Sequence, residues 1–209
     1  TGKEYDIGAW AAYGSLDFNI MEGFIPYIGA KYMTGDDNPY DDNIDAWNSI
    51  TDIARYTPTF GMEDAFVYKL VPTLGSHLYS GNFNWLPKLF GAPTPGYGGI
   101  SNSSSGDAPG MWMFGAGAKG RFGKFSYKVQ GMYFRFAEEE GVEKILHHSV
   151  DDEVGYEIDL LLNYRFGKHF SIGNCSSLFD PGDAMQDIWD PIRGTANDST
   201  ALMNTIELK

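Results

Sequence analysis

Residues 154–166 read VGYEIDLLLNYRF, and apolar side chains occupy every second position of this run. Seven apolar residues, from Val154 to Phe166, fall on one set of alternate positions, while Glu157, Asp159 and Arg165 fall on the other. A helix would scatter the apolar set around its circumference, whereas a β-strand places it on one face and the charges on the opposite face. The run therefore predicts a β-strand with one apolar and one charged face.

Aromatic residues lie near both ends of this apolar face. Tyr156 lies near its start, Tyr164 and Phe166 lie at its end, and aliphatic residues fill the positions between them. Strands that cross a bilayer typically carry such aromatic residues at both interfaces, with an aliphatic band between them. The pattern therefore favours a strand whose apolar face meets lipid.

The same alternation recurs on both sides of this run. It predicts seven strands, at about 8–20, 24–34, 110–122, 124–136, 153–166, 169–178 and 199–209. Asn204 interrupts the apolar face of the last strand, and the segment from Ala65 to Val71 is the best candidate for an eighth.

Short and long connections alternate along the chain. Arg121-Phe122-Gly123-Lys124 and Arg165-Phe166-Gly167-Lys168 form an internal repeat that predicts two tight hairpins. Long polar stretches, at about 35–108, 137–152 and 179–198, make the other connections. Outer-membrane barrels have short periplasmic turns and long extracellular loops, whereas a Greek-key sandwich has no reason to sort its loops by length. We therefore expect an all-β fold, an antiparallel up-and-down transmembrane β-barrel with about seven or eight strands in this chain.

Composition excludes several classes of protein. The 209 residues include 26 Gly and 10 Pro, and 15% are aromatic, which favours many short strands over long helices. The net charge of -13 argues against a nucleic-acid partner, since phosphates require clusters of Lys and Arg. The single Cys175 excludes a disulfide framework, and no run approaches the roughly 20 apolar residues of a transmembrane helix.

Charges recur on the face opposite the apolar positions of several strands. If the apolar face meets lipid, these charges line a water-filled interior and select ions and solutes. If it meets a soluble core, they are ordinary surface charges. The candidate pore-lining residues are Lys31, Lys119, Lys128, Glu157, Asp159 and Arg165.

An acidic loop after residue 35 is a candidate Ca²⁺ site. Its carboxylate oxygens suit Ca²⁺, although their spacing does not match an EF-hand, and a solvated acidic loop is the alternative. The candidate ligands are Asp36, Asp37, Asp41, Asp42 and Asp45. The adjacent His147 and His148 predict no metal site, because neighbours on a strand point to opposite faces. No arrangement of Ser, His and Asp predicts catalysis, so we expect no enzyme.

Three segments together resemble a known family. Residues 26–37, a strand that runs into the acidic loop, the Tyr164-Arg165-Phe166-Gly167 hairpin and the terminal strand are similar to the alginate-export-like porins of the Gram-negative outer membrane. The resemblance is one of pattern and covers most of the chain. It implies a monomeric barrel of about 16–18 strands, of which residues 1–209 would be the C-terminal part. Exporters of an anionic polysaccharide would have a strongly basic pore, whereas the charge here is mixed.

The leading hypothesis is a channel in the bacterial outer membrane for passive passage of small hydrophilic or charged solutes. Its surroundings would be membrane lipid and lipopolysaccharide, and it would need no cofactor other than Ca²⁺ in the acidic loop. Two alternatives stay open. One is a soluble or surface β-sandwich that binds carbohydrate through Trp47, Trp85 and Trp189. The other is a non-conducting scaffold barrel that holds a partner protein in its interior or at its loops.

Overall fold

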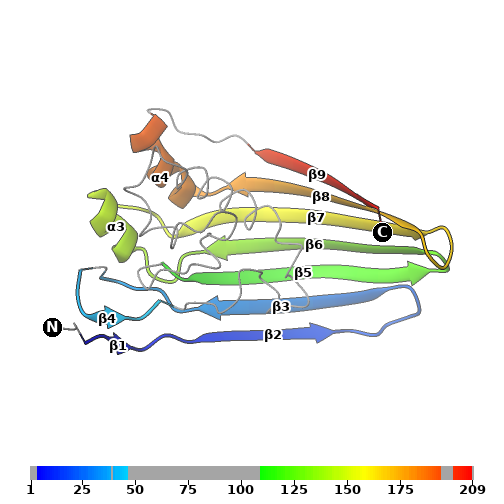
Figure 1. The fold of residues 1–209 in the computed structure, drawn as a ribbon, viewed down its shortest axis with the longest axis horizontal. Helices are drawn as coiled ribbons and strands as arrows, with labels where there is room; N and C mark the ends of the chain where they lie inside the picture. Colours follow the sequence, from blue (N-terminus) through cyan, green and yellow to red (C-terminus); the bar gives the residue numbers. More distant parts are fainter. Residues whose placement is uncertain (1–3, 39, 47–108, 194–199, 209) are drawn as a thin grey trace.

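The computed structural model describes residues 4–38, 40–46, 109–193 and 200–208, most of which form one seven-stranded antiparallel sheet (Figure 1). Each strand pairs with its neighbours in sequence, in the order β2-β3-β5-β6-β7-β8-β9. The strands are β2 (Ala11–Asp17), β3 (Ile25–Met33), β5 (Met111–Phe122), β6 (Phe125–Arg135), β7 (Glu153–Arg165), β8 (Ser171–Pro181) and β9 (Ala201–Leu208). The seven predicted strands and their antiparallel order are confirmed.

The connections differ from the prediction in two places. The strand predicted at 169–178 runs from Ser171 to Pro181, where Pro181 still pairs with Gly155 of β7. In the turn before it, the backbone N–H of Phe166 donates to the Phe170 carbonyl at 3.0 Å. Stretches predicted as loops also contain regular structure, namely β4 (Asn43–Ile44) and the helices α3 (Glu140–Leu146) and α4 (Asp183–Arg193). β4 pairs in parallel with β1 (Asp6–Ile7), which precedes the first predicted strand. The candidate eighth strand, Ala65 to Val71, lies outside the described residues.

The two ends of the sheet have different connections. At one end, which we call the turn end, short turns at 18–24, 123–124 and 166–170 join the strands. Phe122 pairs directly with Phe125 there, and Gly123 has a φ of 59°, a left-handed conformation that glycine adopts without strain. At the opposite end, the loop end, lie residues 34–46, 136–152 and 182–193 with both helices (Figure 1). The predicted sorting of connections by length is confirmed within the described ranges.

Both helices are short and lie at the loop end. His147, with a φ of 62°, ends α3 in the left-handed conformation, and α4 contacts β7 and β8. Neither helix of the described ranges has the length and apolar character that crossing a membrane would require. The largest group of buried apolar residues lies at this end, and its members are Met33, Met111, Met113, Phe134, Phe136, Val142, Val150, Val154, Phe179, Ala184, Met185 and Ile188.

The sheet is open within the part of the chain that is described. β2 pairs there only with β3, and β9 pairs only with β8, so the described strands form an open meander and not a closed barrel. The described strands thus establish the antiparallel, mostly β architecture.

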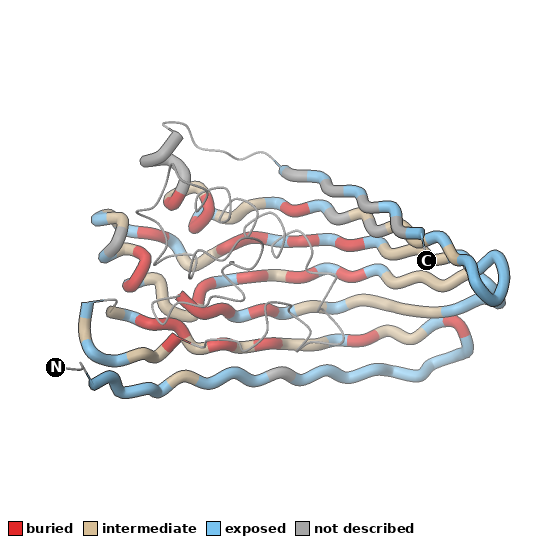
Figure 2. Tube along the Cα trace, viewed as in Figure 1, coloured by how far each residue is buried: buried red, intermediate tan, exposed pale blue. Residues whose placement is uncertain are grey.

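The polar face of the sheet is buried and its apolar face is exposed, which is the reverse of the arrangement in a soluble protein. Along β7, Glu157 is 0% exposed while its neighbour Ile158 is 55% exposed, and buried and exposed residues alternate along β6 and β7 in Figure 2. We call the face with exposed apolar side chains the apolar face. Its large members include Trp10, Leu16, Ile28, Phe114, Val129, Tyr156, Ile158, Leu160, Tyr164, Leu178, Leu202 and Ile206. The opposite face, which carries Tyr27, Gln130, Glu157 and Asp159, is the charged face.

Candidate functional site

All six candidate pore-lining residues lie on the charged face. The strand register sets Lys119 directly opposite Lys128 and places Glu157 and Asp159 two positions apart on β7. Lys31, Glu157 and Asp159 are buried, whereas Arg165 is exposed at the turn end. The alternation in the sequence therefore predicts the face of each residue, while only the register reveals which of them are neighbours.

A chain of hydrogen bonds crosses the middle of the charged face. The Tyr27 hydroxyl donates to Oε1 of Gln130 at 2.7 Å, and Nε2 of Gln130 donates to Oδ2 of Asp159 at 2.8 Å. Tyr27 reaches β6 across β5 because Gly117 lies between them, where an added Cβ would stand 2.7 Å from the tyrosine hydroxyl. The chain thus links β3, β6 and β7 through side chains that are at most 1% exposed.

Two lysines flank the ring of Tyr27 on the turn-end side. The Nζ atoms of Lys119 and Lys128 each lie 5.4 Å from the ring centroid, a distance at which a cation is attracted to the ring face. Lys119 also pairs with Asp17 at 2.7 Å. Like charges directly opposite each other destabilise a sheet, and the ring and the carboxylate offset that repulsion here.

The accessible part of the charged face lies at the turn end. A groove of about 720 Å³ opens there, and its polar lining includes Glu22, Lys119, Arg121 and Ser126. The middle of the face is covered, since Gln130, Glu157 and Asp159 are buried. A solute that followed this face would meet a basic, solvated end and then a buried polar middle.

Two bands of aromatic rings cross the apolar face. Near the loop end, Trp10, Tyr32 and Trp112 form a row with ring centroids 4.8 and 4.2 Å apart, and Tyr133 continues the band with Tyr156 at 4.8 Å. Near the turn end, the rings of Phe122 and Tyr127, of Tyr164 and Phe166, and of Phe166 and Phe170 lie 6.0, 4.8 and 5.4 Å apart. Aliphatic residues of β7 lie between the bands, so the aromatic pattern predicted for one strand extends across the sheet.

A small polar cluster interrupts the apolar face at β8 and β9. The Asn174 amide donates to Asn204 Oδ1 at 3.1 Å, and the Asn204 amide donates to the Ser176 hydroxyl at 2.7 Å. Ser176 in turn donates to Asn174 at 3.1 Å. The sequence alone reveals Asn204 as an interruption, but only the β8–β9 register shows that its polar partners lie beside it.

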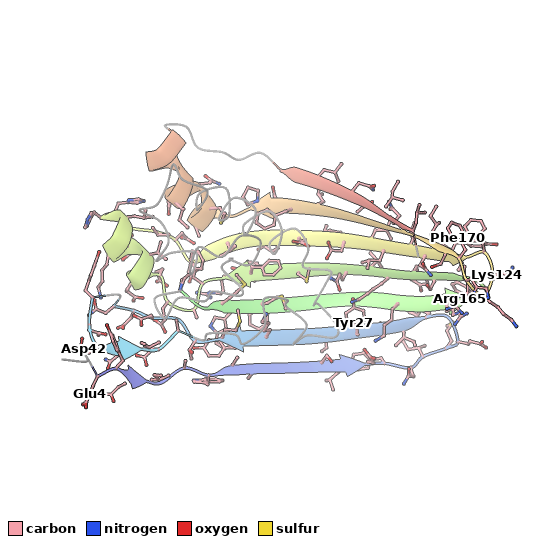
Figure 3. The ribbon with its side chains drawn as sticks, in the orientation of Figure 1. Glu4, Tyr27, Asp42, Lys124, Arg165 and Phe170 are labelled. Carbon is pink, nitrogen blue, oxygen red and sulfur yellow. The ribbon has the colours of Figure 1, made fainter. Side chains whose placement is uncertain are left out.

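Charge is distributed unevenly between the two ends, as Figure 3 shows for Glu4 and Asp42 at one end and Lys124 and Arg165 at the other. At the turn end, the basic residues are Lys119, Arg121, Lys124, Lys128, Arg165 and Lys168, and the acidic ones are Asp17, Glu22 and, by its strand position, Glu207. At the loop end, the basic residues of the described ranges are Lys31, Arg135, Lys144 and, by its helix position, Arg193. The acidic residues there are Glu4, Asp6, Asp36, Asp37, Asp41, Asp42, Asp45, Glu138, Glu139, Glu140, Glu143, Asp151, Asp152, Glu153, Asp180, Asp183, Asp187 and Asp190.

The five aspartates proposed as Ca²⁺ ligands lie at the loop end, four of them before β4 and Asp45 directly after it. Asp36 accepts hydrogen bonds from the backbone N–H groups of Asn38, at 2.8 Å, and Asp45, at 3.3 Å. Asp41 accepts bonds from the backbone of Asn43 and the amide of Asn38. Within the described ranges, no group of three or more His, Cys, Asp or Glu side chains is arranged to hold a metal ion. The Ca²⁺ site stays a prediction.

The pKa values of two carboxyl groups at the loop end are shifted in opposite directions. Burial raises the pKa of Glu138, and the nearby carboxylates of Glu140 and Asp37 raise it further. The pKa of Glu143 is lowered, first because the backbone N–H of Val150 donates to it and second because the Ser149 hydroxyl does. His148 ties the same segment to α4, with Nε2 at 2.9 Å from the carbonyl of Asp187.

Of the three tryptophans considered for carbohydrate binding, Trp189 lies in α4, while Trp47 and Trp85 lie outside the described residues. A comparison with protein-family models finds no match for this chain, and a comparison with curated proteins finds no significant one. Function is therefore inferred from the two faces of the sheet and from the charges at its ends.

Proposed function

We propose that this chain forms part of a transmembrane β-barrel of the bacterial outer membrane, and that the barrel is a channel for passive passage of small hydrophilic or charged solutes. The observation that carries the proposal is the inverted burial, in which Ile158 is exposed and the adjacent Glu157 is buried. Soluble monomers rarely expose large contiguous apolar patches, whereas lipid-facing strands require one.

Strand length and ring placement support a bilayer as the surrounding medium. A transmembrane β-strand needs about 9–11 residues, and β5, β6, β7 and β8 have 12, 11, 13 and 11. The two aromatic bands lie at both ends of these strands, where the two membrane interfaces would be. In a β-sandwich the apolar face would instead pack against a second sheet, so its exposure weighs against the carbohydrate-binding alternative.

Closure of the barrel would require further strands beside β2 and β9. The described meander has seven strands, fewer than the about 16–18 that the porin resemblance implies. The edges of β2 and β9 would then pair with strands outside the described residues. The loops at 34–46, 136–152 and 182–193 would face the exterior and its lipopolysaccharide, and the short turns would face the periplasm.

The solute path in this proposal runs along the charged face. Lys119 and Arg165 would form an accessible entrance at the turn end, and the row of Gln130, Glu157 and Asp159 would form the narrow middle. Both signs of charge occur along the path, which suits solutes of mixed or small charge better than an anionic polysaccharide.

A second candidate function is a scaffold barrel that conducts no ions and holds a partner protein. One observation favours it: the polar side chains in the middle of the charged face, Gln130, Glu157 and Asp159, are buried and not open to solvent. A partner protein that filled the interior would keep these side chains away from solvent. Conductance distinguishes the two functions.

The deciding experiment uses the native protein extracted from outer membranes in mild detergent. A band that migrates faster when the sample is not boiled is expected, because a closed barrel resists detergent until it is heated. Purified protein added to a planar bilayer should then produce discrete conductance steps. A heat-modifiable protein without conductance supports the scaffold, and a protein that is soluble without detergent and shows no shift contradicts both.

Within the channel proposal, Asp159→Asn is the sharpest test of the narrow middle. An asparagine oxygen can still accept the hydrogen bond from Gln130, so the change removes charge while keeping the side-chain shape. We expect the reversal potential in a KCl gradient to shift toward anion selectivity. The same change at Asp180, on the apolar face of β8 at the loop end, is the control and should have a smaller effect.

A further inference from the structure

The charged ends of the sheet are far apart compared with the range of their electric fields. β7 has 13 residues, which span roughly 40 Å in an extended strand. The Debye length is about 10 Å at 0.1 M salt. Each end therefore sets the local ion concentration independently, with anions enriched at the basic turn end and cations enriched at the acidic loop end.

We infer that the proposed channel rectifies, passing more current at one polarity than at the other, because its cation-enriched and anion-enriched ends lie in series along the strand axis. The inference rests on the proposed function and specifies how the charges at the two ends of the channel act on the current. A channel with a uniform charge selects ions but has no reason to distinguish the two directions of current.

The turn-end charges are placed where passing ions would meet them. Lys119 and Arg121 line the open groove, and Arg165 is exposed on the same face. Asp17 pairs with Lys119, which leaves an excess of positive charge in this group. Accessible charges act directly on mobile ions at each end, and the buried carboxylates of the middle lie between the two ends.

The sign of the effect follows from which ion is enriched at which end. When the compartment at the loop end is positive, cations move inward from the end where they are concentrated, and anions do the same from the turn end. Both carriers then accumulate in the channel and the current is high. The opposite polarity draws both carriers out of the channel, and the current falls.

The test is the current–voltage curve of single channels formed by the full chain in a planar bilayer. In 0.1 M KCl the currents at opposite polarities of 100 mV should differ by about twofold. In 1 M KCl the Debye length falls to about 3 Å, and the ratio should approach one. A symmetric curve in 0.1 M KCl overturns the inference and leaves the channel intact, whereas the absence of any current overturns the proposed function and the inference with it.

Two variants with the same change in net charge locate the cause. Arg165→Glu weakens the basic turn end and should lower the current ratio toward one. Lys144→Glu makes the acidic loop end more acidic, and should keep or raise the ratio. Lys144 is exposed and bonds the Asp37 carbonyl, so its replacement leaves the sheet in place. Equal effects from the two variants would overturn the inference, because they would show that only net charge matters.

Discussion

The apolar and charged faces of the sheet use the same strands but follow opposite rules of burial. On β7 the apolar Ile158 and Leu160 are exposed, while Glu157 and Asp159 between and beside them are fully buried. Burying a charge is costly unless it is paired, and exposing a contiguous apolar face to water is unfavourable. Both features are expected together when lipid surrounds the sheet and the polar groups lie inside, so the comparison of the two faces supports the proposed bilayer environment.

The largest effect is expected from two neighbouring leucines of β7. Leu160→Arg places a guanidinium on the apolar face and should destabilise the folded protein in a bilayer by about 2–4 kcal/mol, the cost of Arg near the midplane. Leu161→Arg makes the same change on the charged face and should cost less. The measurement is the free energy of unfolding by denaturant in lipid vesicles. If Leu161→Arg were the more damaging variant, the apolar face would not meet lipid.

A second pair of variants compares glycines on the two faces. At Gly117, on the charged face, an added Cβ would stand 2.3 Å from the Val129 carbonyl oxygen, whereas nothing lies within 4 Å of one added at Gly131, on the apolar face. Gly117→Ala should therefore cost about 1–3 kcal/mol through overpacking. Gly131→Ala should change stability by less than about 0.5 kcal/mol. Equal losses in an unfolding titration would mean that Tyr27 does not cross β5 over Gly117.

The hydrogen-bond chain predicts a somewhat smaller difference between two tyrosines. Tyr27→Phe removes the donor to the buried Gln130 and should cost about 1–2 kcal/mol, because the amide oxygen loses its partner away from water. Tyr156→Phe alters a half-exposed ring on the apolar face and should be nearly neutral. The readout is again unfolding by denaturant, and a neutral Tyr27→Phe would show that the chain contributes little to stability.

These contrasts also separate what the sequence predicts from what it cannot. Alternation is local, since each side chain takes its face from its own position in the strand, so the strands and the face of Glu157 or Lys128 follow from the sequence. Register is not local. Tyr27 and Gln130 are 103 residues apart, and their contact depends on the pairing of β3 with β5, on the pairing of β5 with β6 and on the space above Gly117.

The predicted end of β8 at residue 178 falls short of Pro181, because Asp180 occupies an apolar-face position and Pro181 is a residue that usually ends a strand. Asn174 and Ser176 lie on its apolar face, so the alternation that marks the other strands is lost where polar residues satisfy one another across to Asn204. The helices α3 and α4 are absent from the prediction because both lie in the polar stretches between strands, where strand alternation gives no signal for a helix. Local pattern therefore predicts the apolar face best, and predicts least where polar side chains find partners far away in sequence.

The smallest effect concerns the loop end, where ordinary aqueous rules are expected to hold. Because hydrogen bonds from Val150 and Ser149 lower the pKa of Glu143 in the folded state, its contribution to stability is present above the unfolded pKa and is lost as pH falls through the folded pKa. The contribution of Glu138 to stability changes with pH in the opposite direction. Because its pKa is raised in the folded state, its contribution is present at low pH and is lost as pH rises through the folded pKa.

Ser149→Ala should therefore raise the pKa of Glu143 toward its ordinary value, while the backbone bond from Val150 keeps part of the shift. The pKa of Glu138 should stay above its ordinary value in the same variant, because its causes are burial and the carboxylates of Glu140 and Asp37. Carboxyl titration by NMR in detergent micelles measures both. A Glu143 pKa unmoved by Ser149→Ala would assign its shift to Val150 alone, and a change at Glu138 would mean that the two sites are coupled through α3.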